Sequence, residues 1–489
     1  MVFHMVDVTI IGAGIIGSFL AHDLSKYQLR VLVLEKDSDV ANEASMANSA
    51  IVHAGHDPKD GTLKAKLNVR GNRMYETVCR DLGVSYQRTS AFVVSTSKEE
   101  NLILEQLYKQ ASDRQIPVSF LTGAEAIAKE KNLSETVIRA IELPTTAIIY
   151  PWEVAIALME EAVLNDVTVC LNQEVRMITK SDLYYEIHTQ NQTYQSRYII
   201  NAAGVHADDI YRMVSPKHAF RIIPRKGEYY VLDRLPEPLV QRVIYPVPSA
   251  LGKGVLVVPT IHGNLLLGPN SSITTQKDEK NTTKEALDYV RREVSKTVRN
   301  IPMNQVIRTF AGLRPTGESG DFVIEEAQDA EHFVNVACIE SPGIASAPAI
   351  SEYVLTDILM KQLSMIKKET YQRRTPILDC KNLSQTERKE LVKRDKTYAN
   401  VICRCEQITE GEILDAIRRP LGAKSVKGVK KRVRPGMGRC QGGFCEPRVI
   451  DILARELGIS ALDILLDGEH STLLMAETKE EGCISSESV

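Results

Sequence analysis

The first part of the chain alternates between short apolar runs and a helical repeat. Val6–Ile11 is an apolar run of strand length, and Val31–Leu34 is a second one, followed by Glu35. Between them, Ser18–Lys26 carries its apolar side chains at helical spacing. This order predicts a strand, a helix and a second strand, which begin an α/β domain with a parallel sheet.

Two later stretches, residues 88–150 and 216–320, have a different pattern. Short β-branched and apolar runs, such as Ala91–Ser95 and Leu265–Gly268, are separated by proline and glycine. This pattern is typical of an antiparallel sheet. Between the two stretches, Pro151–Asn165 has the periodicity of an amphipathic helix. The chain therefore predicts a second, antiparallel domain inserted into the first.

A glycine turn joins the first predicted strand to its helix. Gly12 permits the tight turn, Gly14 lets backbone N–H groups approach a pyrophosphate, and Gly17 lets helix and strand pack closely. Glu35 lies 18 residues after Gly17 and is placed to accept hydrogen bonds from ribose hydroxyls. An acid at this position favours FAD or NAD over NADP, and the motif alone leaves FAD and NAD open.

The composition is that of a globular protein. Of 489 residues, 43% are hydrophobic and 25% are charged, which excludes a disordered chain, a collagen-like fibre and a coiled coil. No window holds the roughly 18 consecutive apolar residues that a membrane-spanning helix needs. The amino-terminus lacks the basic region of a secretory signal. We therefore expect a cytoplasmic protein of about three domains.

Charge is distributed unevenly, although the net charge of the chain is only −3. The first 360 residues carry −8, residues 361–448 carry +12 and residues 449–489 carry −7. The change near residue 360 predicts an appended module with its own partner.

Four cysteines in this module form two close pairs. One residue separates Cys403 from Cys405, and four residues separate Cys440 from Cys445. Clustered thiols in a cytosolic protein are more often metal ligands than disulfides. Four thiolates suit zinc or an iron–sulfur cluster, but a C-x-C pair differs from the usual spacing of zinc ligands. Glycines around the second pair free backbone N–H groups to point at a negatively charged cluster.

Several motifs in the first 360 residues resemble the D-amino-acid-oxidase-type flavoprotein superfamily. They are the glycine turn with Glu35, Asn201–Asp208 (NAAGVHAD), Ala311–Ile324 (AGLRPTGESGDFVI) and Ile339–Ala349 (IESPGIASAPA). The resemblance implies FAD as the cofactor. It also implies a Rossmann-like FAD-binding domain with an antiparallel-sheet cap domain that binds the substrate.

Within that superfamily, Ala47–Asn72 is most similar to the FAD-dependent glycerol-3-phosphate dehydrogenases and oxidases. The L-2-hydroxyglutarate dehydrogenases share part of the same pattern. Ala50 replaces a glycine that is usual in both groups. The resemblance implies oxidation of sn-glycerol 3-phosphate to dihydroxyacetone phosphate by hydride transfer to flavin N5, with another 2-hydroxy acid or an O2-using oxidase as alternatives. A redox-sensing subunit without a substrate of its own is the alternative from another class.

The resemblance also assigns roles to individual residues. His53 is the expected base, with His56 as its competitor, because imidazole can accept a proton near neutral pH. Arg314, expected just after a strand, resembles the arginine that anchors the anionic substrate, and its planar fork suits phosphate or carboxylate. Other candidate substrate contacts are Ser49, Lys253 and Ser341. The FAD contacts implied by the resemblance are Gly12, Gly14, Gly17, Glu35, Asn48, Ser49, Val175, Gly204, Gly343 and Ile344.

The carboxy-terminal motifs, CRCE and GRCQGGFC, resemble the bacterioferritin-associated-ferredoxin-like 2Fe–2S domain. The resemblance implies that Cys403, Cys405, Cys440 and Cys445 hold the cluster, through which electrons pass to a protein or quinone-linked acceptor. Seven basic and no acidic residues lie from Lys424 to Arg439. Without a nucleic-acid-binding motif, this run is interpreted as a solvated face, or as charges that tune the cluster or dock an acidic electron carrier.

The expected fold is therefore α/β plus α+β, with a small helical iron–sulfur domain at the carboxy-terminus. Expected domain boundaries are 1–87, 151–215 and 321–360 for the FAD-binding domain, 88–150 and 216–320 for the cap, 361–398 for a linker, 399–460 for the 2Fe–2S domain, and 461–489 for an acidic tail.

Overall fold

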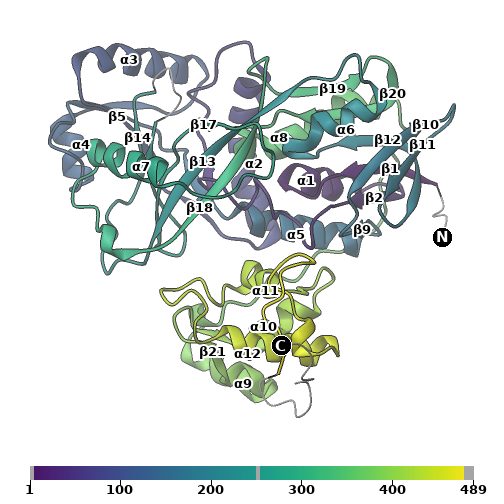
Figure 1. Ribbon diagram of the computed structural model, residues 1–489. Helices are drawn as coiled ribbons and strands as arrows, with labels where there is room; N and C mark the ends of the chain where they lie inside the picture. Colours follow the sequence, from purple (N-terminus) through teal and green to yellow (C-terminus); the bar gives the residue numbers. More distant parts are fainter. Residues whose placement is uncertain (1–4, 249–253, 478–489) are drawn as a thin grey trace, which may run out of the picture. The chain divides into compact units, whose positions relative to one another are not determined.

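The computed structural model describes residues 5–248 and 254–477. The chain divides into two compact units, an amino-terminal unit of residues 1–376 and a carboxy-terminal unit of residues 377–489 (Figure 1). No helix in the described residues is both long enough and apolar enough to cross a membrane.

The first sheet of the amino-terminal unit has a parallel core. β1 pairs with β2 and β12, β2 also pairs with β9, and β12 also pairs with β20, all in parallel. The bounds are β1 (Val6–Ile11), β2 (Val31–Leu34), β9 (Thr168–Cys170), β12 (Thr193–Asn201) and β20 (Ala330–Ala337). Every residue of β2 is buried, as expected of a strand that is covered on both faces. The predicted Rossmann-like domain is confirmed.

Antiparallel strands and helices complete this domain. The added strands are β10 (Val175–Lys180), β11 (Tyr185–Thr189) and β19 (Val323–Ala327), and the helices are α1 (Ile15–Leu24), α2 (Leu63–Leu82), α5 (Pro151–Leu164), α6 (Ala207–Val214) and α8 (Gly343–Tyr353). Helix α1 packs against α5 and α8, and α2 packs along α8.

The second sheet of the amino-terminal unit is largely antiparallel, and its strands come from both inserted stretches. The order is β17-β13-β16-β15-β14-β5-β7-β6, and β18 pairs with β13 along its whole length. The bounds are β5 (Ala91–Ser95), β6 (Ser119–Thr122), β7 (Arg139–Glu142), β13 (Ile222–Leu232), β14 (Val243–Pro246), β15 (Leu256–Pro259), β16 (Leu265–Gly268), β17 (Ser272–Ile273) and β18 (Val306–Gly317). The predicted antiparallel cap sheet is confirmed, except that β14 and β5 run parallel.

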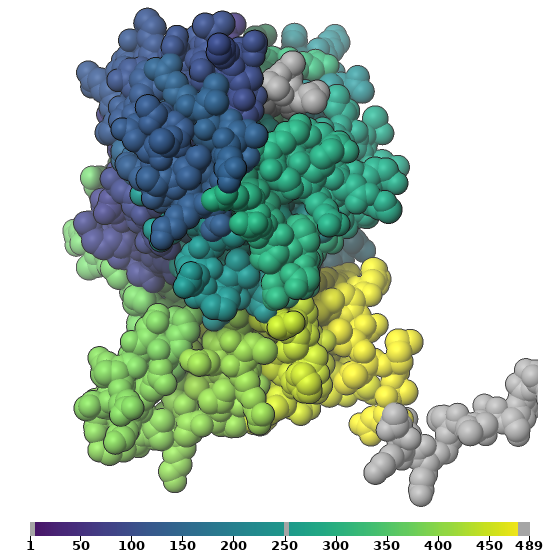
Figure 2. All heavy atoms as spheres, turned by 90° about the vertical axis from the view of Figure 1, so that its left-hand side faces the viewer, coloured from purple at the N-terminus to yellow at the C-terminus, as the bar shows by residue number. Residues whose placement is uncertain are grey.

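Both faces of the cap sheet are covered. Ala91 and Val93 of β5 join one apolar cluster, and the alternate residues Phe92 and Val94 join another. Helix α3 (Lys98–Asp113) contributes to the first cluster, and α4 (Gly123–Lys129) and α7 (Lys284–Thr297) contribute to the second. Figure 2 shows the two chain stretches of the cap, in blue and green, lying against each other. A small sheet of β3 (Ile51–Val52), β4 (Tyr86–Arg88) and β8 (Ala147–Ile149) joins the cap to the loop before α2.

The carboxy-terminal unit is a small helical domain with one short hairpin. Its elements are α9 (Gln385–Arg394), α10 (Glu410–Arg418), α11 (Val426–Val433), α12 (Glu446–Leu457), β21 (Val401–Cys403) and β22 (Ile408–Thr409). Apolar residues of α10, α11 and α12 form one core that includes Cys403 and Cys445. Ile464 also joins this core, so the expected acidic tail begins with a packed segment.

The segment expected as a linker, residues 361–398, is divided between the two units. Its first part packs on the amino-terminal unit, where Lys368 donates its backbone N–H to Lys26, and the buried Arg374 pairs with Glu160 at 2.7 Å. In its second part, Cys380 is buried and its N–H bonds to Glu412. The polar, basic composition predicted a linker because composition does not show which charged side chains are buried. Arg374 can be buried because the Glu160 carboxylate balances its charge.

Candidate functional site

The glycine turn between β1 and α1 requires glycine for two separate reasons. Gly12 has a φ of +101°, and a Cβ there would lie 2.6 Å from the Ala202 carbonyl oxygen. A Cβ at Gly17 would lie only 1.9 Å from the Gly12 carbonyl oxygen. A Cβ at Gly14 would meet only the Ser45 hydroxyl, at 3.3 Å. Gly14 is therefore dispensable for packing and leaves room for a ligand at the start of α1.

We expect Gly17→Ala to lower the thermal midpoint of the apoprotein strongly, because its Cβ must displace the backbone of the turn. The cost is about 3 kcal/mol, the upper range for an overpacked core. Gly14→Ala is the matched control, with an expected cost below about 1 kcal/mol and weaker FAD binding. Thermal unfolding of both apoproteins, with FAD titrations, tests this. Equal loss of stability in the two variants would contradict it.

Glu35 is buried at the carboxyl end of β2. Its carboxylate accepts the backbone N–H groups of Ala13 at 2.7 Å and Asp37 at 2.9 Å. Burial, and next the charge of Asp37, raise the pKa of Glu35 to about 7. The carboxyl group thus lies directly beside the glycine turn, as the sequence motif predicts.

The loop between β2 and α2 is held in one conformation by its own side chains and by the cap. The Asn48 amide donates to the carbonyls of Ala44 and Ser45, and its oxygen accepts the Ala50 N–H. Ala50 has a φ of +59°, a conformation that glycine adopts more readily. This conformation explains why related sequences usually have glycine at this position. Alanine adopts it here with some backbone strain. The Ser49 hydroxyl lies 3.2 Å from the Tyr229 hydroxyl of the cap sheet.

His53 follows β3 in this loop and is buried. Its carbonyl oxygen accepts the side-chain amides of Asn68 at 2.9 Å and Asn72 at 3.1 Å, both on α2. Its Nδ1 lies 3.0 Å from the Tyr245 hydroxyl of β14. Burial raises the pKa of Tyr245 far above its usual value, so the phenol stays neutral. The backbone and Nδ1 of His53 are thus held by residues of α2 and of the cap sheet.

Arg314 lies within β18 rather than after the strand that was expected to end at Phe310. Its guanidinium donates to the Asn270 carbonyl at 3.1 Å, and among the described residues no carboxylate is paired with it. The side chain crosses Gly227 of β13, where a Cβ would lie 2.5 Å from Nη2. Among the described residues, Arg314 is therefore held over the sheet as a cation without a carboxylate partner.

One face of the cap sheet brings Arg314 toward the His53 loop. Gly312 and Arg314 are two residues apart on β18, so their side-chain positions share a face of the sheet. On that face, a Cβ at Gly312 would lie 2.0 Å from the Ala47 carbonyl oxygen of the loop. Tyr229, two residues from Gly227, bonds to Ser49 in the same loop. The anion-binding candidate and the base candidate thus belong to two surfaces in direct contact.

The other predicted site residues have diverse surroundings. Gly204 has a φ of +58°, and its ideal Cβ meets nothing within 4 Å. Val175 is the buried first residue of β10, and Gly343 begins α8. The Ile344 carbonyl accepts the Tyr75 hydroxyl at 2.6 Å, whereas Ser341 is exposed. Lys253 lies outside the described residues.

Sequence reasoning missed the residues that support the site. Tyr245, Asn68 and Asn72 position His53, Tyr229 contacts Ser49, and Asn270 accepts from Arg314. The two asparagines lie four residues apart on α2, and a polar pair at helical spacing on a buried face is a signal that could have been noticed. The tyrosines gave no signal, because they come from strands distant in sequence.

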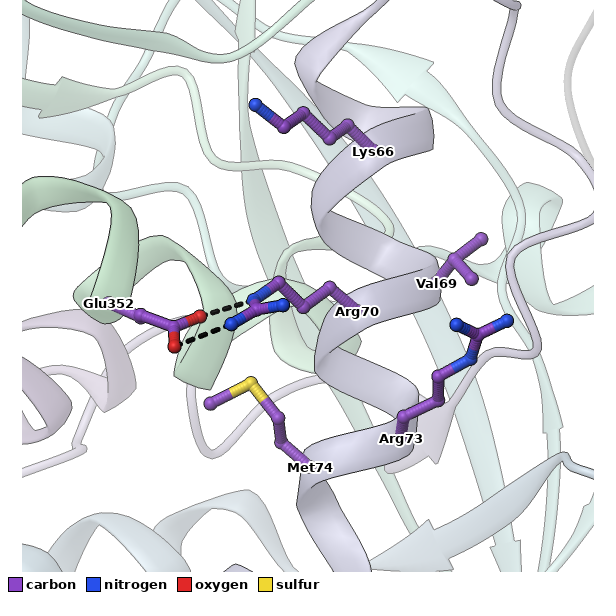
Figure 3. Close-up of a pocket in the computed structure, with 6 residues that line it drawn as sticks. All are labelled: Lys66, Val69, Arg70, Arg73, Met74 and Glu352. Carbon is purple, nitrogen blue, oxygen red and sulfur yellow. Dashed lines mark hydrogen bonds and ion pairs between the residues drawn. The ribbon is translucent and has the colours of Figure 1, made fainter. Parts of the chain in front are cut away.

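A separate hollow of about 320 Å³ is lined by residues of α2 and by Glu352 of α8 (Figure 3). Figure 3 shows Arg70 facing Glu352, and Arg70 Nη2 donates to the carboxylate at 2.6 Å. None of the predicted site residues lines it; its lining consists of Lys66, Val69, Arg70, Arg73, Met74 and Glu352.

In the carboxy-terminal unit each cysteine of the first motif lies beside one of the second: Cys405 beside Cys440, and Cys403 beside Cys445. The Cys405 and Cys440 sulfurs are 3.8 Å apart. A hydrogen bond from Cys445, and next the N–H groups of Gly436 and Glu406, lower the pKa of Cys403 to about 6. A Cβ at Gly438 would lie 2.4 Å from Cys405 Cβ, so glycine lets the two segments meet.

The donor set of these four thiols fits a 2Fe–2S cluster. A structural zinc site needs four ligands around one centre, whereas a 2Fe–2S cluster has two irons to share them. Thiol pairs served by backbone N–H groups therefore fit the cluster that the sequence predicted.

Most basic side chains of the run from Lys424 to Arg439 are buried or ion-paired within the carboxy-terminal unit. Lys431 and Arg432 are buried, and Arg432 donates to the carbonyls of Leu421 and Gly428. Outside that core, Lys427 pairs with Asp467, and Arg434 pairs with Glu406. The interpretation of the whole run as a solvated face is therefore wrong, because charge in sequence does not reveal which side chains turn inward.

Comparison with known proteins agrees with this geometry. Residues 7–356 match the FAD dependent oxidoreductase (DAO) family model. The chain belongs to this family. Residues 401–455 match the BFD-like [2Fe-2S] binding domain, so the FAD-dependent oxidoreductase carries a second cofactor domain. It is a flavoenzyme with the predicted pair of cofactors, FAD and a 2Fe–2S cluster.

Three comparisons are the most informative for this FAD-dependent oxidoreductase. A glycerol 3-phosphate dehydrogenase of Caloramator mitchellensis is 48% identical over 482 residues, 98% of this chain and 100% of that protein. A glycerol 3-phosphate oxidase of Mycoplasma pneumoniae is 31% identical over 354 residues, 70% of this chain and 92% of that protein. The solved structure of L-alpha-glycerophosphate oxidase from M. pneumoniae with FAD bound covers 76% of this chain and 99% of its own, at 29% identity and a TM-score of 0.73.

Proposed function

We propose that this enzyme oxidises sn-glycerol 3-phosphate to dihydroxyacetone phosphate. The observation that supports it most is the contact between the cap face that bears Arg314 and the loop that bears His53. The full-length likeness to a glycerol 3-phosphate dehydrogenase supports the same substrate. FAD, when bound, supplies the acceptor for the hydride that leaves the substrate C2 carbon.

His53 acts as the base in this proposal. Its Nε2 accepts the proton of the C2 hydroxyl while the carbon loses hydride. In the tautomer that this role requires, Nδ1–H donates to the Tyr245 hydroxyl 3.0 Å away and Nε2 carries the lone pair that accepts the proton. Asn68 and Asn72 hold the His53 backbone, so the ring is aimed without help from the substrate.

Arg314 binds the phosphate. Its guanidinium has no carboxylate partner among the described residues, so its charge is available to an anionic substrate. A planar fork can bond two phosphate oxygens at once, and a half-buried position strengthens that attraction relative to bulk water. Ser49 is a further hydroxyl contact on the facing loop, and Lys253 remains a candidate second cation.

Cys403, Cys405, Cys440 and Cys445 would hold a 2Fe–2S cluster, which would supply a route for electrons to a separate acceptor. A cluster passes electrons singly, whereas substrate oxidation yields two. An oxidase on the same fold would instead produce stoichiometric hydrogen peroxide. Peroxide measured in air, in the wild type and in a Cys405→Ser variant, separates these two routes.

An anaerobic titration of the purified holoenzyme with sn-glycerol 3-phosphate tests the proposed substrate. We expect flavin absorbance to bleach at low substrate concentration, followed by loss of cluster absorbance. L-2-hydroxyglutarate is the comparison substrate, because Arg314 suits carboxylate as well as phosphate. Bleaching by L-2-hydroxyglutarate alone would overturn the proposal.

FAD affinity of the apoprotein is expected to fall as the pH is lowered from about 8 to about 5.5. Burial raises the pKa of Glu35 to about 7, so the carboxyl group is protonated at the acidic end. It must lose that proton to accept both ribose hydroxyls, which costs up to tenfold in affinity for each pH unit below about 7. Fluorescence titrations check this, and Glu35→Gln should flatten the profile. An unchanged profile in that variant would remove Glu35 as the cause.

A further inference from the structure

The two cysteine pairs of the carboxy-terminal unit differ in their exposure. Cys403 and Cys445 are buried in the apolar core, whereas Cys405 is exposed and Cys440 is partly exposed. An electron carrier can therefore approach closely only on the side of Cys405 and Cys440. This side is a surface of the carboxy-terminal unit.

Three exposed side chains are direct chain neighbours of the cysteines. Arg404 lies between Cys403 and Cys405, Arg439 precedes Cys440, and Phe444 precedes Cys445. The exposed fraction of Phe444 is 84%, unusual for so large an apolar side chain. We call these three residues, with the exposed Gly443 and Pro447, the cluster face.

The charge of the cluster face is uncompensated. Within the described residues, neither Arg404 nor Arg439 forms an ion pair or a hydrogen bond through its side chain. Other arginines of the unit are engaged: Arg434 pairs with Glu406, and Arg448 bonds to Asn400. Two unpaired arginines and one exposed aromatic ring, each next to a cysteine in the chain, have the composition of a protein contact site, where Arg and Phe are enriched.

We propose that the cluster face docks a small acidic protein that accepts single electrons. This inference rests on the proposed exit of electrons through the cluster. Acidic residues of the partner would pair with Arg404 and Arg439, and an apolar spot would cover Phe444. For each substrate molecule oxidised, two acceptor molecules gain one electron each in successive encounters, and two protons are released. Opposite charges steer such an encounter and make its rate depend on ionic strength.

Binding of an acidic rubredoxin to the oxidised holoenzyme, measured by calorimetry at low and high salt, tests the docking. We expect salt-sensitive binding that weakens at least tenfold in Arg404→Glu/Arg439→Glu and also weakens in Phe444→Ala. Lys389→Glu/Arg394→Glu on α9 is the matched control, with the same charge change at two exposed positions, and should bind as the wild type. The visible absorption of the cluster reports that every variant is folded and loaded.

Three outcomes would overturn the docking proposal. They are wild-type binding that does not depend on salt, equal weakening by the control pair, and stronger binding of a basic cytochrome c than of rubredoxin. A shift of the cluster's reduction potential in Arg404→Glu/Arg439→Glu without a change in rubredoxin binding would assign these arginines to tuning instead. Because binding is measured without substrate, failure of glycerol 3-phosphate to bleach the flavin would refute the proposed function and leave the docking result separate.

Discussion

Replacement of His53 by asparagine is expected to lower kcat for glycerol 3-phosphate oxidation by 10²- to 10⁴-fold, the usual contribution of a positioned general base. The amide cannot accept the hydroxyl proton, but it preserves the size and polarity of the buried site. Steady-state assays with an artificial electron acceptor measure the loss. KM should change much less, because His53 acts on the proton that is transferred and not on the phosphate.

Two further variants make this test specific. Tyr245→Phe removes the hydroxyl bonded to Nδ1, so it should lower kcat by about tenfold and alter the pH profile while the fold is kept. His56→Asn should retain most activity, because the Tyr245 hydroxyl bonds to Nδ1 of His53, whereas the His56 ring contacts Tyr245 edge to face. A large loss in His56→Asn with an active His53→Asn would transfer the role of base to His56.

Arg314→Ala is expected to lower kcat/KM by about 10²- to 10³-fold. This corresponds to about 3–4 kcal/mol, the cost of removing one partner of a charged contact that excludes water. Most of the loss should appear in KM, because the arginine binds the phosphate before and during hydride loss. Guanidinium ion in the assay should restore part of the activity if the cavity left by the side chain remains open.

Arg308→Ala is the control on the same strand, where an exposed arginine can be removed without touching the site. It should leave kcat/KM within about twofold of the wild type, as is usual for a surface substitution. An Arg314→Ala enzyme with normal KM, or equal losses in both variants, would show that Arg314 does not bind the substrate.

The local elements were predictable because their sequence signals act over short distances. β1, β2 and β5 have the expected bounds, since apolar runs of strand length end at glycine or polar residues. The glycine turn was also predictable, because a side chain at Gly12 or Gly17 would clash with nearby backbone atoms. The spacing of the four cysteines was enough to predict that they are ligands of a metal or an iron–sulfur cluster.

Long-range contacts were not predictable in the same way. Arg314 was expected after a strand, yet β18 continues to Gly317 because β13 pairs with it over its whole length. Tyr245 reaches His53 only through the pairing of β14 in the cap sheet. The basic run suggested an open surface, but Lys431 and Arg432 are buried. Each case depends on a partner that lies far away in the chain.

The left-handed conformation of Ala50 affects how the loop that bears His53 can be engineered. The loop keeps this conformation because Asn48 bonds to the Ala50 N–H and the Ile149 N–H bonds to the Ala50 carbonyl. A glycine there would relieve local strain, yet it would also widen the range of shapes that the free loop samples. With alanine, the strained conformation at residue 50 is kept by these two hydrogen bonds. Weakening either bond should therefore disorder the His53 segment more readily than it would with glycine at this position.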